Sequence, residues 1–198
     1  MIISFLASHG GSSAKAIIAA IRNGELAADV GILITNNRDS AILHWCLDND
    51  VNVRHISSKT HRGEQNADEA ISTVLQDAGT DLVVCSGYMK AIGPSTLEAF
   101  PLKILNIHPA LLPRYGGSGM YGDRVHAAVL AAGEKTSGAS VHYVTAGIDE
   151  GPCILRQEVA VVPEDTVESL RARVQAIEPG LYLAALRKVL AGRAPRST

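Results

Sequence analysis

The chain has 198 residues and a formal net charge of −2, with 46% hydrophobic and 19% charged residues. This length and composition predict a single domain, residues 1–198, with a core of aliphatic rather than aromatic side chains. Acidic and basic residues are mixed along the chain without a basic block, which argues against a nucleic-acid partner. The apolar runs are too short to cross a bilayer, so no membrane association is expected.

The N-terminus and the cysteines favour a cytoplasmic protein. The opening run MIISFLASHGG lacks the basic start of a signal peptide and is expected to form a strand. Cys46, Cys85 and Cys153 lie far apart without CxxC spacing, so neither a disulfide framework nor a metal site is predicted. Cys153 lies in an apolar segment and is expected in the core rather than as a nucleophile.

Short apolar runs alternate with helical patterns through the first half of the chain. Strands are expected at residues 2–7, 29–37, 51–57, 81–88 and 103–109, and helices at residues 12–24, 40–50 and 67–79. Ser12 or Ser13 would cap the first helix and Gly24 would end it. This alternation is typical of a parallel sheet with right-handed crossovers.

The alternation changes after Pro113. A helix is expected at residues 123–133, two strands at residues 138–144 and 153–162, and a long helix at residues 166–192 with a break or kink near Pro179. The final RAPRST is expected to fray. The predicted fold is α/β: an open, mostly parallel, Rossmann-like twisted sheet with helices on both faces, and an antiparallel addition near the C-terminal part.

The turn after the first strand, ASHGGSSAK, is the first candidate for a binding site. Backbone N–H groups at a glycine-opened helix start form an anion cradle. The turn lacks the GxGxxG pattern of dinucleotide-binding proteins. An ordinary tight turn with a serine cap explains the same residues, and both interpretations stay open.

The segment ILNIHPALLPRYGG carries polar residues at the end of an apolar strand. Asn106 and His108 project from one face because side chains alternate along a strand, and Pro109 ends the strand. Ligands of open α/β sheets bind at the carboxyl ends of strands. A loop histidine bonded to the backbone is the simpler explanation for His108 alone, and Asn106 beside it favours a site.

A second polar-tipped strand is GASVHYVTAGIDEGPCIL. Asp149 lies in a glycine-flanked turn, where a solvated aspartate is the default interpretation. His142, within the strand, is compatible with a hydrogen-bonded core histidine. His126, on the helix before this strand, is compatible with a surface residue.

The two segments together resemble the folate-dependent formyltransferases. NIHPALLPRYGG and GASVHYVTAGIDEGP match that family in order and spacing, and so do the glycine-serine turn, VVCSGYMKAIGP and RARVQAIE. The resemblance implies the formyltransferase fold and transfer of a formyl group from 10-formyltetrahydrofolate, a co-substrate, to the amine of glycinamide ribonucleotide in purine biosynthesis. It implies small-molecule substrates, no metal, and a monomer or homodimer.

The resemblance assigns catalysis to Asn106, His108 and Asp149. An oxyanion develops when an amine attacks the formyl carbon, and Asn106 and a protonated His108 would donate hydrogen bonds to that oxygen. Each donor would stabilise the transition state by roughly 3–4 kcal/mol. Asp149 would keep the imidazole charged or hold an ordered water. A proton would pass from the amine to the folate nitrogen through His108 or that water.

The resemblance also assigns the binding residues. The substrate phosphate would lie in the cradle of Gly11, Ser12 and Ser13, and Glu178 would contact the acceptor. His142 and His126 would be supporting residues. The folate pocket would be lined by two segments, represented by Met89, Lys90, Ala91 and Ile92 and by main-chain groups near Ala139 and Val144.

The chain departs from the family pattern at three places, and the altered phosphate turn and the altered loop face the acceptor side of the implied site. Ser13 replaces an asparagine of the phosphate turn, Ala139 replaces a threonine, and GGSGMYGDRVH is longer and richer in glycine than its counterpart. Three alternatives therefore stay open: a formyltransferase for another nucleotide- or sugar-phosphate amine, a formyltetrahydrofolate hydrolase, and a binding module without turnover. Release of tetrahydrofolate only when an amine is added would identify a transferase. Release with water alone would identify a hydrolase, and binding without release would identify a binding module.

Overall fold

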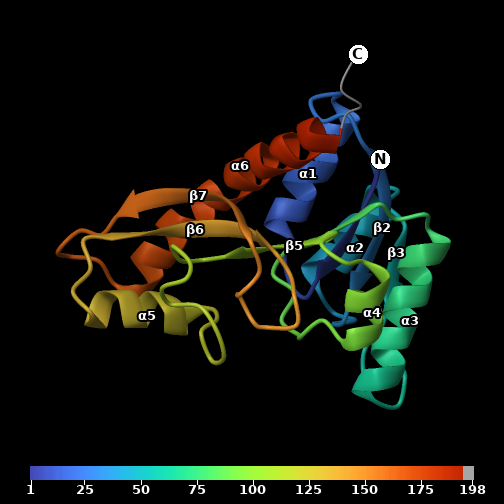
Figure 1. The fold of residues 1–198 in the computed structure, drawn as a ribbon, viewed down its shortest axis with the longest axis horizontal. Coiled ribbons are helices and arrows are strands. Elements are labelled where there is room, and N and C mark those ends of the chain that lie inside the picture. The colour runs from blue at the N-terminus through green and yellow to red at the C-terminus, as the bar shows by residue number, and fades with distance from the viewer. Residues whose placement is uncertain (194–198) are drawn as a thin grey trace. The chain divides into compact units, whose positions relative to one another are not determined.

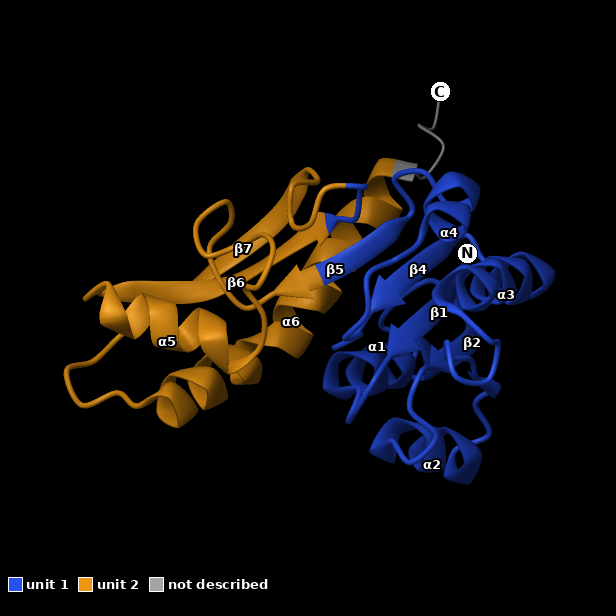
Figure 2. Cartoon of the chain, turned by 90° about the horizontal axis from the view of Figure 1, so that it is seen from below, with its two compact units in different colours: residues 1–106, 143–146 blue, residues 107–142, 147–198 orange. Residues whose placement is uncertain are grey.

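A computed structural model describes residues 1–193, so the expectation for the terminal residues 194–198 lies outside the described residues (Figure 1). The chain divides into two compact units (Figure 2). Unit 1 contains residues 1–106 and 143–146, and unit 2 contains residues 107–142 and the chain from residue 147 onward. No helix within the described residues combines the length and the apolar character that a membrane span requires.

Unit 1 is a parallel sheet with helices on both faces. Its strands follow the order β3-β2-β1-β4-β5, and every pair among them is parallel. The chain passes through β1 (Ile2–Ala7), α1 (Ser12–Arg22), β2 (Asp29–Thr35), α2 (Ala41–Asp48), β3 (Val53–His55), α3 (Glu64–Asp77), β4 (Leu82–Cys85), α4 (Pro94–Ala99) and β5 (Ile104–His108). The last two residues of β5 already belong to unit 2.

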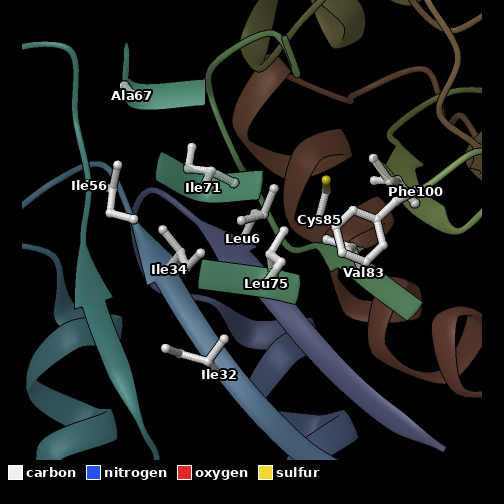
Figure 3. Packing of buried hydrophobic residues seen from close by; sticks show 11 residues of the cluster. Leu6, Ile32, Ile34, Ile56, Ala67, Ile71, Leu75, Val83, Cys85 and Phe100 are labelled. Carbon is white, nitrogen blue, oxygen red and sulfur yellow. The ribbon is translucent and has the colours of Figure 1, made fainter. Parts of the chain in front are cut away.

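The strand order explains which helices share a face. The chain moves from β1 outward to β3 and then back across to β4 and β5, so right-handed crossovers place α1 and α2 on one face and α3 and α4 on the other. The α3 face buries a cluster drawn from four strands and α3, with Leu6, Ile34, Ile71, Leu75 and Val83 among its members (Figure 3). Both faces are covered, so the central strands β1 and β4 are almost entirely buried.

Unit 2 contains the antiparallel addition. Its helices and strands are α5 (Asp123–Ala131), β6 (Thr136–Tyr143), whose last residue belongs to unit 1, β7 (Cys153–Ala160) and α6 (Val167–Arg193). Strand β6 pairs with β7 in antiparallel register from Thr136↔Ala160 onward. The register shifts between Val141 and His142. The predicted α/β fold, mostly parallel with an antiparallel C-terminal part, is therefore confirmed.

Three local predictions were wrong. Ser12 and Ser13 do not cap α1, because Gly11 occupies the N-cap position with a φ of 60° and the serines are the first two helical residues. Helix α6 is continuous through Pro179, so the predicted break does not occur there, while a kink at this residue stays a prediction. Helix α3 begins at Glu64 rather than at Ala67, and the sequence patterns did not predict the short helix α4, which opens with Pro94.

Candidate active site

Two polar side chains lie at the carboxyl end of β5. Asn106 and His108 occupy alternate positions of this strand and share one of its faces, whereas Ile107 points to the other face. Asn106 lies opposite Cys85 of β4 in the strand register and is half-buried. His108, the last residue of the strand, is only 4% exposed. The strand thus delivers an amide and a buried imidazole to one place.

Both ring nitrogens of His108 face hydrogen-bond acceptors. Nε2 lies 2.7 Å from the backbone carbonyl oxygen of Tyr115, and Nδ1 lies 3.3 Å from Oδ2 of Asp149. A carbonyl oxygen has no proton to give, so Nε2 carries the hydrogen. A neutral ring would then direct a lone pair from Nδ1 at the carboxylate, whereas the doubly protonated ring donates to both partners.

Asp149 is held by three groups of unit 2. Oδ2 accepts a hydrogen bond from the backbone N–H of Gly117 at 3.1 Å in addition to facing His108, and Oδ1 lies 3.5 Å from Nε2 of His142. The side chain of Asp149 is only 9% exposed, and its φ is 60°. The default interpretation of a solvated turn aspartate was therefore wrong. A strained, buried carboxylate between two histidines is typical of functional sites.

The two further histidines are both buried in unit 2. His142 on β6 is 2% exposed and reaches Asp149. His126 on α5 is 1% exposed, so its interpretation as a surface residue was wrong. Burial lowers the pKa of His126, and nearby His108 contributes in the same direction. Within the described residues, Nδ1 of His126 has no hydrogen-bond partner.

The turn between β1 and α1 requires glycine at residue 11. Gly11 has a φ of 60°, and a β-carbon there would lie 2.7 Å from the side chain of Ile42. Ser12 and Ser13 follow as the first two helical residues, whose N–H groups have no partner within the helix. Ser12 is exposed and Ser13 is 2% exposed. The departure from the family pattern at Ser13 thus affects a buried side chain.

Unit 1 contains a cavity of about 1180 Å³ beside the segment that the resemblance assigns to folate. Lys90, Ala91 and Ile92 line it together with Tyr88 and residues of the loops that follow β2 and β3. Lys90 pairs with Glu64 at 3.0 Å, and the backbone N–H of Met89 donates to Oγ of Ser8 at 2.8 Å. This volume exceeds that of a typical small-ligand pocket.

The remaining residues assigned to folate lie on β6 and just after it. Ala139 is fully buried in unit 2. Val144 belongs to unit 1, where its N–H donates to the carbonyl of Ile104 at 2.8 Å and its side chain packs on the core cluster. In the described part of the chain, no group of three His, Cys, Asp or Glu side chains is arranged to hold a metal ion.

Glu178 lies on α6 in unit 2. Burial raises the pKa of its carboxyl group from 4.5 to about 7. Perturbed carboxyl groups of this kind often lie at ligand sites. The group would be divided between its two protonation states near neutral pH.

We expect Glu178→Gln to stabilise the protein at alkaline pH only. The pKa of Glu178 is higher in the folded than in the unfolded state, so the folded protein loses stability as pH rises from about 4.5 through 7. The neutral amide avoids this loss, and the free energy of unfolding should increase by about 1–3 kcal/mol at pH 8. Urea unfolding at pH 4.5 and pH 8 measures the difference, with the exposed Glu158→Gln as control. Equal effects at both pH values would contradict the assignment.

Sequence reasoning missed two partners of the His108–Asp149 pair. The Tyr115 carbonyl and the Gly117 N–H are backbone groups, so no side-chain pattern could identify them. The clustered glycines at residues 116, 117 and 119 were the one available signal that the backbone approaches another group closely there.

Comparison with protein families relates this arrangement to known proteins. The family described as formyl transferase matches residues 1–186. A phosphoribosylglycinamide formyltransferase of Haemophilus influenzae is 32% identical over 191 residues, which cover 96% of this chain and 88% of the relative. The chloroplastic phosphoribosylglycinamide formyltransferase of Arabidopsis thaliana is 36% identical over 182 residues, covering 91% of this chain. The chain spans only 62% of the length of that plant protein.

A solved structure agrees with these sequence matches. The crystal structure of glycinamide ribonucleotide transformylase 1 from Symbiobacterium toebii superposes with a TM-score of 0.91 and 37% sequence identity. The superposition covers 98% of this chain and 89% of that chain. The likeness therefore extends over both compact units.

Proposed function

The chain belongs to the formyl transferase family, and from this membership we propose that it transfers a formyl group from 10-formyltetrahydrofolate to the amine of glycinamide ribonucleotide in purine biosynthesis. The single observation that carries the proposal is the pairing of His108 with Asp149. These residues come from the two segments that carry the family resemblance, and both are buried. The names of the similar proteins from Haemophilus influenzae and Arabidopsis thaliana support this acceptor.

The proposed reaction begins with attack of the acceptor amine on the formyl carbon. A carbon–nitrogen bond forms, and the electrons of the carbonyl double bond move to the oxygen. Collapse of this tetrahedral intermediate breaks the bond to the folate nitrogen, which takes a proton while the amine loses one. His108, or a water held by Asp149, carries that proton. The oxyanion is the group that the enzyme must stabilise.

Asn106 and His108 are the proposed donors to the oxyanion. A side-chain amide such as that of Asn106 donates an N–H in either protonation state of the site, whereas an imidazolium at His108 would contribute a positive charge as well. Without substrate, the Nε2–H of His108 is directed at the neutral Tyr115 carbonyl. A negatively charged oxygen competes for this proton more strongly than a carbonyl does. The bond to substrate would therefore strengthen in the transition state, which is the condition for raising kcat.

The binding roles follow the family resemblance. We propose that Gly11, Ser12 and Ser13 hold the acceptor phosphate at the start of α1, and that Glu178 contacts the acceptor. The cavity of about 1180 Å³ beside Lys90, Ala91 and Ile92 would accept part of the folate. Met89, Ala139 and Val144 keep the folate-binding roles that the resemblance gives them. His142 would support Asp149, and His126 would support His108.

We expect Gly11→Ala to weaken acceptor binding without removing catalysis. The new β-carbon meets Ile42 at 2.7 Å and φ is 60°, so the turn must shift. The acceptor KM should rise about tenfold, equivalent to about 1.4 kcal/mol of binding free energy. Gly10→Ala is the matched control, because nothing lies within 4 Å of a β-carbon there. An unchanged acceptor KM in Gly11→Ala would remove this turn from the phosphate site.

An acceptor screen tests the proposed function. The protein is mixed with 10-formyltetrahydrofolate and with glycinamide ribonucleotide, with other phosphorylated amines, or with buffer alone. Tetrahydrofolate and formylated product are then measured by chromatography. Equal amounts of both, appearing only with glycinamide ribonucleotide, are expected. Release in buffer alone would identify a hydrolase, preference for another amine would change the acceptor, and binding without release would identify a binding module.

The wider organisation of the protein is also a proposal. The two compact units would act as one formyltransferase domain, because the family match runs through residues of both units. All three cysteines are free, which fits a reducing compartment such as the cytoplasm. We propose a monomer or homodimer that acts on small molecules.

A further inference from the structure

The turn formed by residues 114–117 holds both partners of the His108 ring. The carbonyl of Tyr115 accepts from Nε2 of His108, and two residues later the N–H of Gly117 donates to the same Asp149 oxygen that faces Nδ1. Gly116 lies against Asp149, because a β-carbon at residue 116 would lie 3.3 Å from the Asp149 β-carbon. The orientation of this turn therefore determines what both ring nitrogens contact.

The turn needs an anchor because its backbone is strained. Tyr115 has a φ of 56°, which a non-glycine residue with a large side chain seldom adopts. Such a conformation persists only where surrounding contacts hold it. The direction of the Tyr115 carbonyl depends on this φ, so the contacts that hold Tyr115 also hold the acceptor of the His108 proton.

Glu134 supplies these contacts from the connection between α5 and β6. Its Oε1 accepts a hydrogen bond from the Tyr115 hydroxyl at 2.8 Å, and its Oε2 accepts one from Nη1 of Arg114 at 3.2 Å. Nη2 of Arg114 also forms an ion pair with Oε1. The Tyr115 hydroxyl and Arg114 together lower the pKa of the Glu134 carboxyl group. One carboxylate thus binds two consecutive residues of the turn.

We propose that Glu134 is a positioning residue for formyl transfer, which anchors Tyr115 so that its carbonyl keeps His108 oriented with a proton on Nε2. The kinetic part of this inference rests on the proposed function. Glu134 does not touch the reacting atoms and acts through Tyr115 alone. Arg114 has a side chain that is 64% exposed, so its pairing with Glu134 contributes little by comparison.

The state of the His108 ring provides a test that does not require turnover. Nitrogen-15 NMR of the imidazole should show a slowly exchanging proton on Nε2 of His108 in the unaltered protein. In Glu134→Ala and in Tyr115→Phe this proton signal should be lost through faster exchange, whereas Glu158→Ala, an exposed carboxylate of β7, should retain it. Retention of the signal in both Glu134→Ala and Tyr115→Phe would overturn the proposal.

Kinetics of the same variants test the consequence for catalysis. Glu134→Ala should lower kcat about tenfold, equivalent to loss of one hydrogen bond to a charged group, with both KM values within about twofold of the unaltered protein. Tyr115→Phe should lower kcat in the same way, and the double variant should be no slower than Glu134→Ala. The kcat of Arg114→Ala should stay within about twofold of that of the unaltered protein.

Two kinetic outcomes would contradict the inference. If the decreases in kcat of the two single variants were additive in the double variant, Glu134 and Tyr115 would act separately. If Arg114→Ala lowered kcat as much as Glu134→Ala does, the ion pair between Arg114 and Glu134 would be responsible for the effect. Failure of the unaltered protein to transfer a formyl group would reject the proposed function. The NMR comparison would still decide whether Glu134 controls the His108 ring.

Discussion

Asp149→Asn should lower kcat about a thousandfold while leaving the fold intact. Asparagine matches aspartate in shape and tolerates the φ of 60° found at this position. The substitution therefore removes the charge and little else. His108 loses its buried carboxylate partner, and the amide directs an N–H at one of the two histidines that now face carboxylate oxygens. Neutralising the carboxylate that orients a catalytic histidine costs a comparable factor, about 10⁴, in serine proteases.

The neighbouring residue offers a matched control for this variant. Glu150→Gln changes the same amount of charge one residue further along, at an exposed position. Its kcat with glycinamide ribonucleotide should stay within about threefold of the unaltered protein. Circular dichroism and urea unfolding would establish that both variants fold. A kcat of Asp149→Asn close to that of Glu150→Gln would remove Asp149 from the proposed mechanism.

His108→Ala should produce a loss of similar size, about 10²–10³ in kcat, because it removes both the charged donor and the proposed proton carrier. The acceptor KM should change much less, since the phosphate cradle of α1 is untouched. Steady-state kinetics with varied glycinamide ribonucleotide separates the two parameters. The double variant with Asp149→Asn should be scarcely slower than either single variant, because residues that act as a unit are not additive.

His142→Ala distinguishes the two histidines that share Asp149. His142 approaches Oδ1 at 3.5 Å and has no proposed contact with substrate, so its removal should cost about tenfold in kcat through Asp149 alone. If His142→Ala were as slow as His108→Ala, the roles of the two histidines would have to be exchanged or shared. Near-normal turnover of His108→Ala would remove the imidazole from the oxyanion site.

The serine at residue 13 is less disruptive to the implied phosphate site than the sequence suggested. Ser13 is buried inside the first turn of α1, whereas the exposed hydroxyl is that of Ser12. The proposed phosphate cradle would depend chiefly on backbone N–H groups and on Gly11, which has a left-handed conformation. Glycinamide ribonucleotide therefore remains the proposed acceptor despite the departure at residue 13.

The sequence by itself determined the alternation of strands and helices, the family, and the pair Asn106 and His108 at the end of β5. The family came from the resemblance of two separated motifs. The alternation and the pair follow from local rules, because the period of apolar residues distinguishes strand from helix and the period of two puts residues 106 and 108 on one face. A local rule failed at the start of α1, where Gly11, packed against Ile42, rather than a serine is the N-cap.

Only the tertiary structure decided the environment of the imidazole. Asp149 had the sequence features of a solvated turn residue, yet it is buried between His108 and His142. The second partner of His108 is a backbone carbonyl, and Glu134 reaches that carbonyl only through the Tyr115 side chain. Peptide groups are identical in every residue, and contacts between distant segments depend on how the whole chain packs. Patterns along the sequence therefore do not predict these backbone hydrogen bonds and long-range contacts.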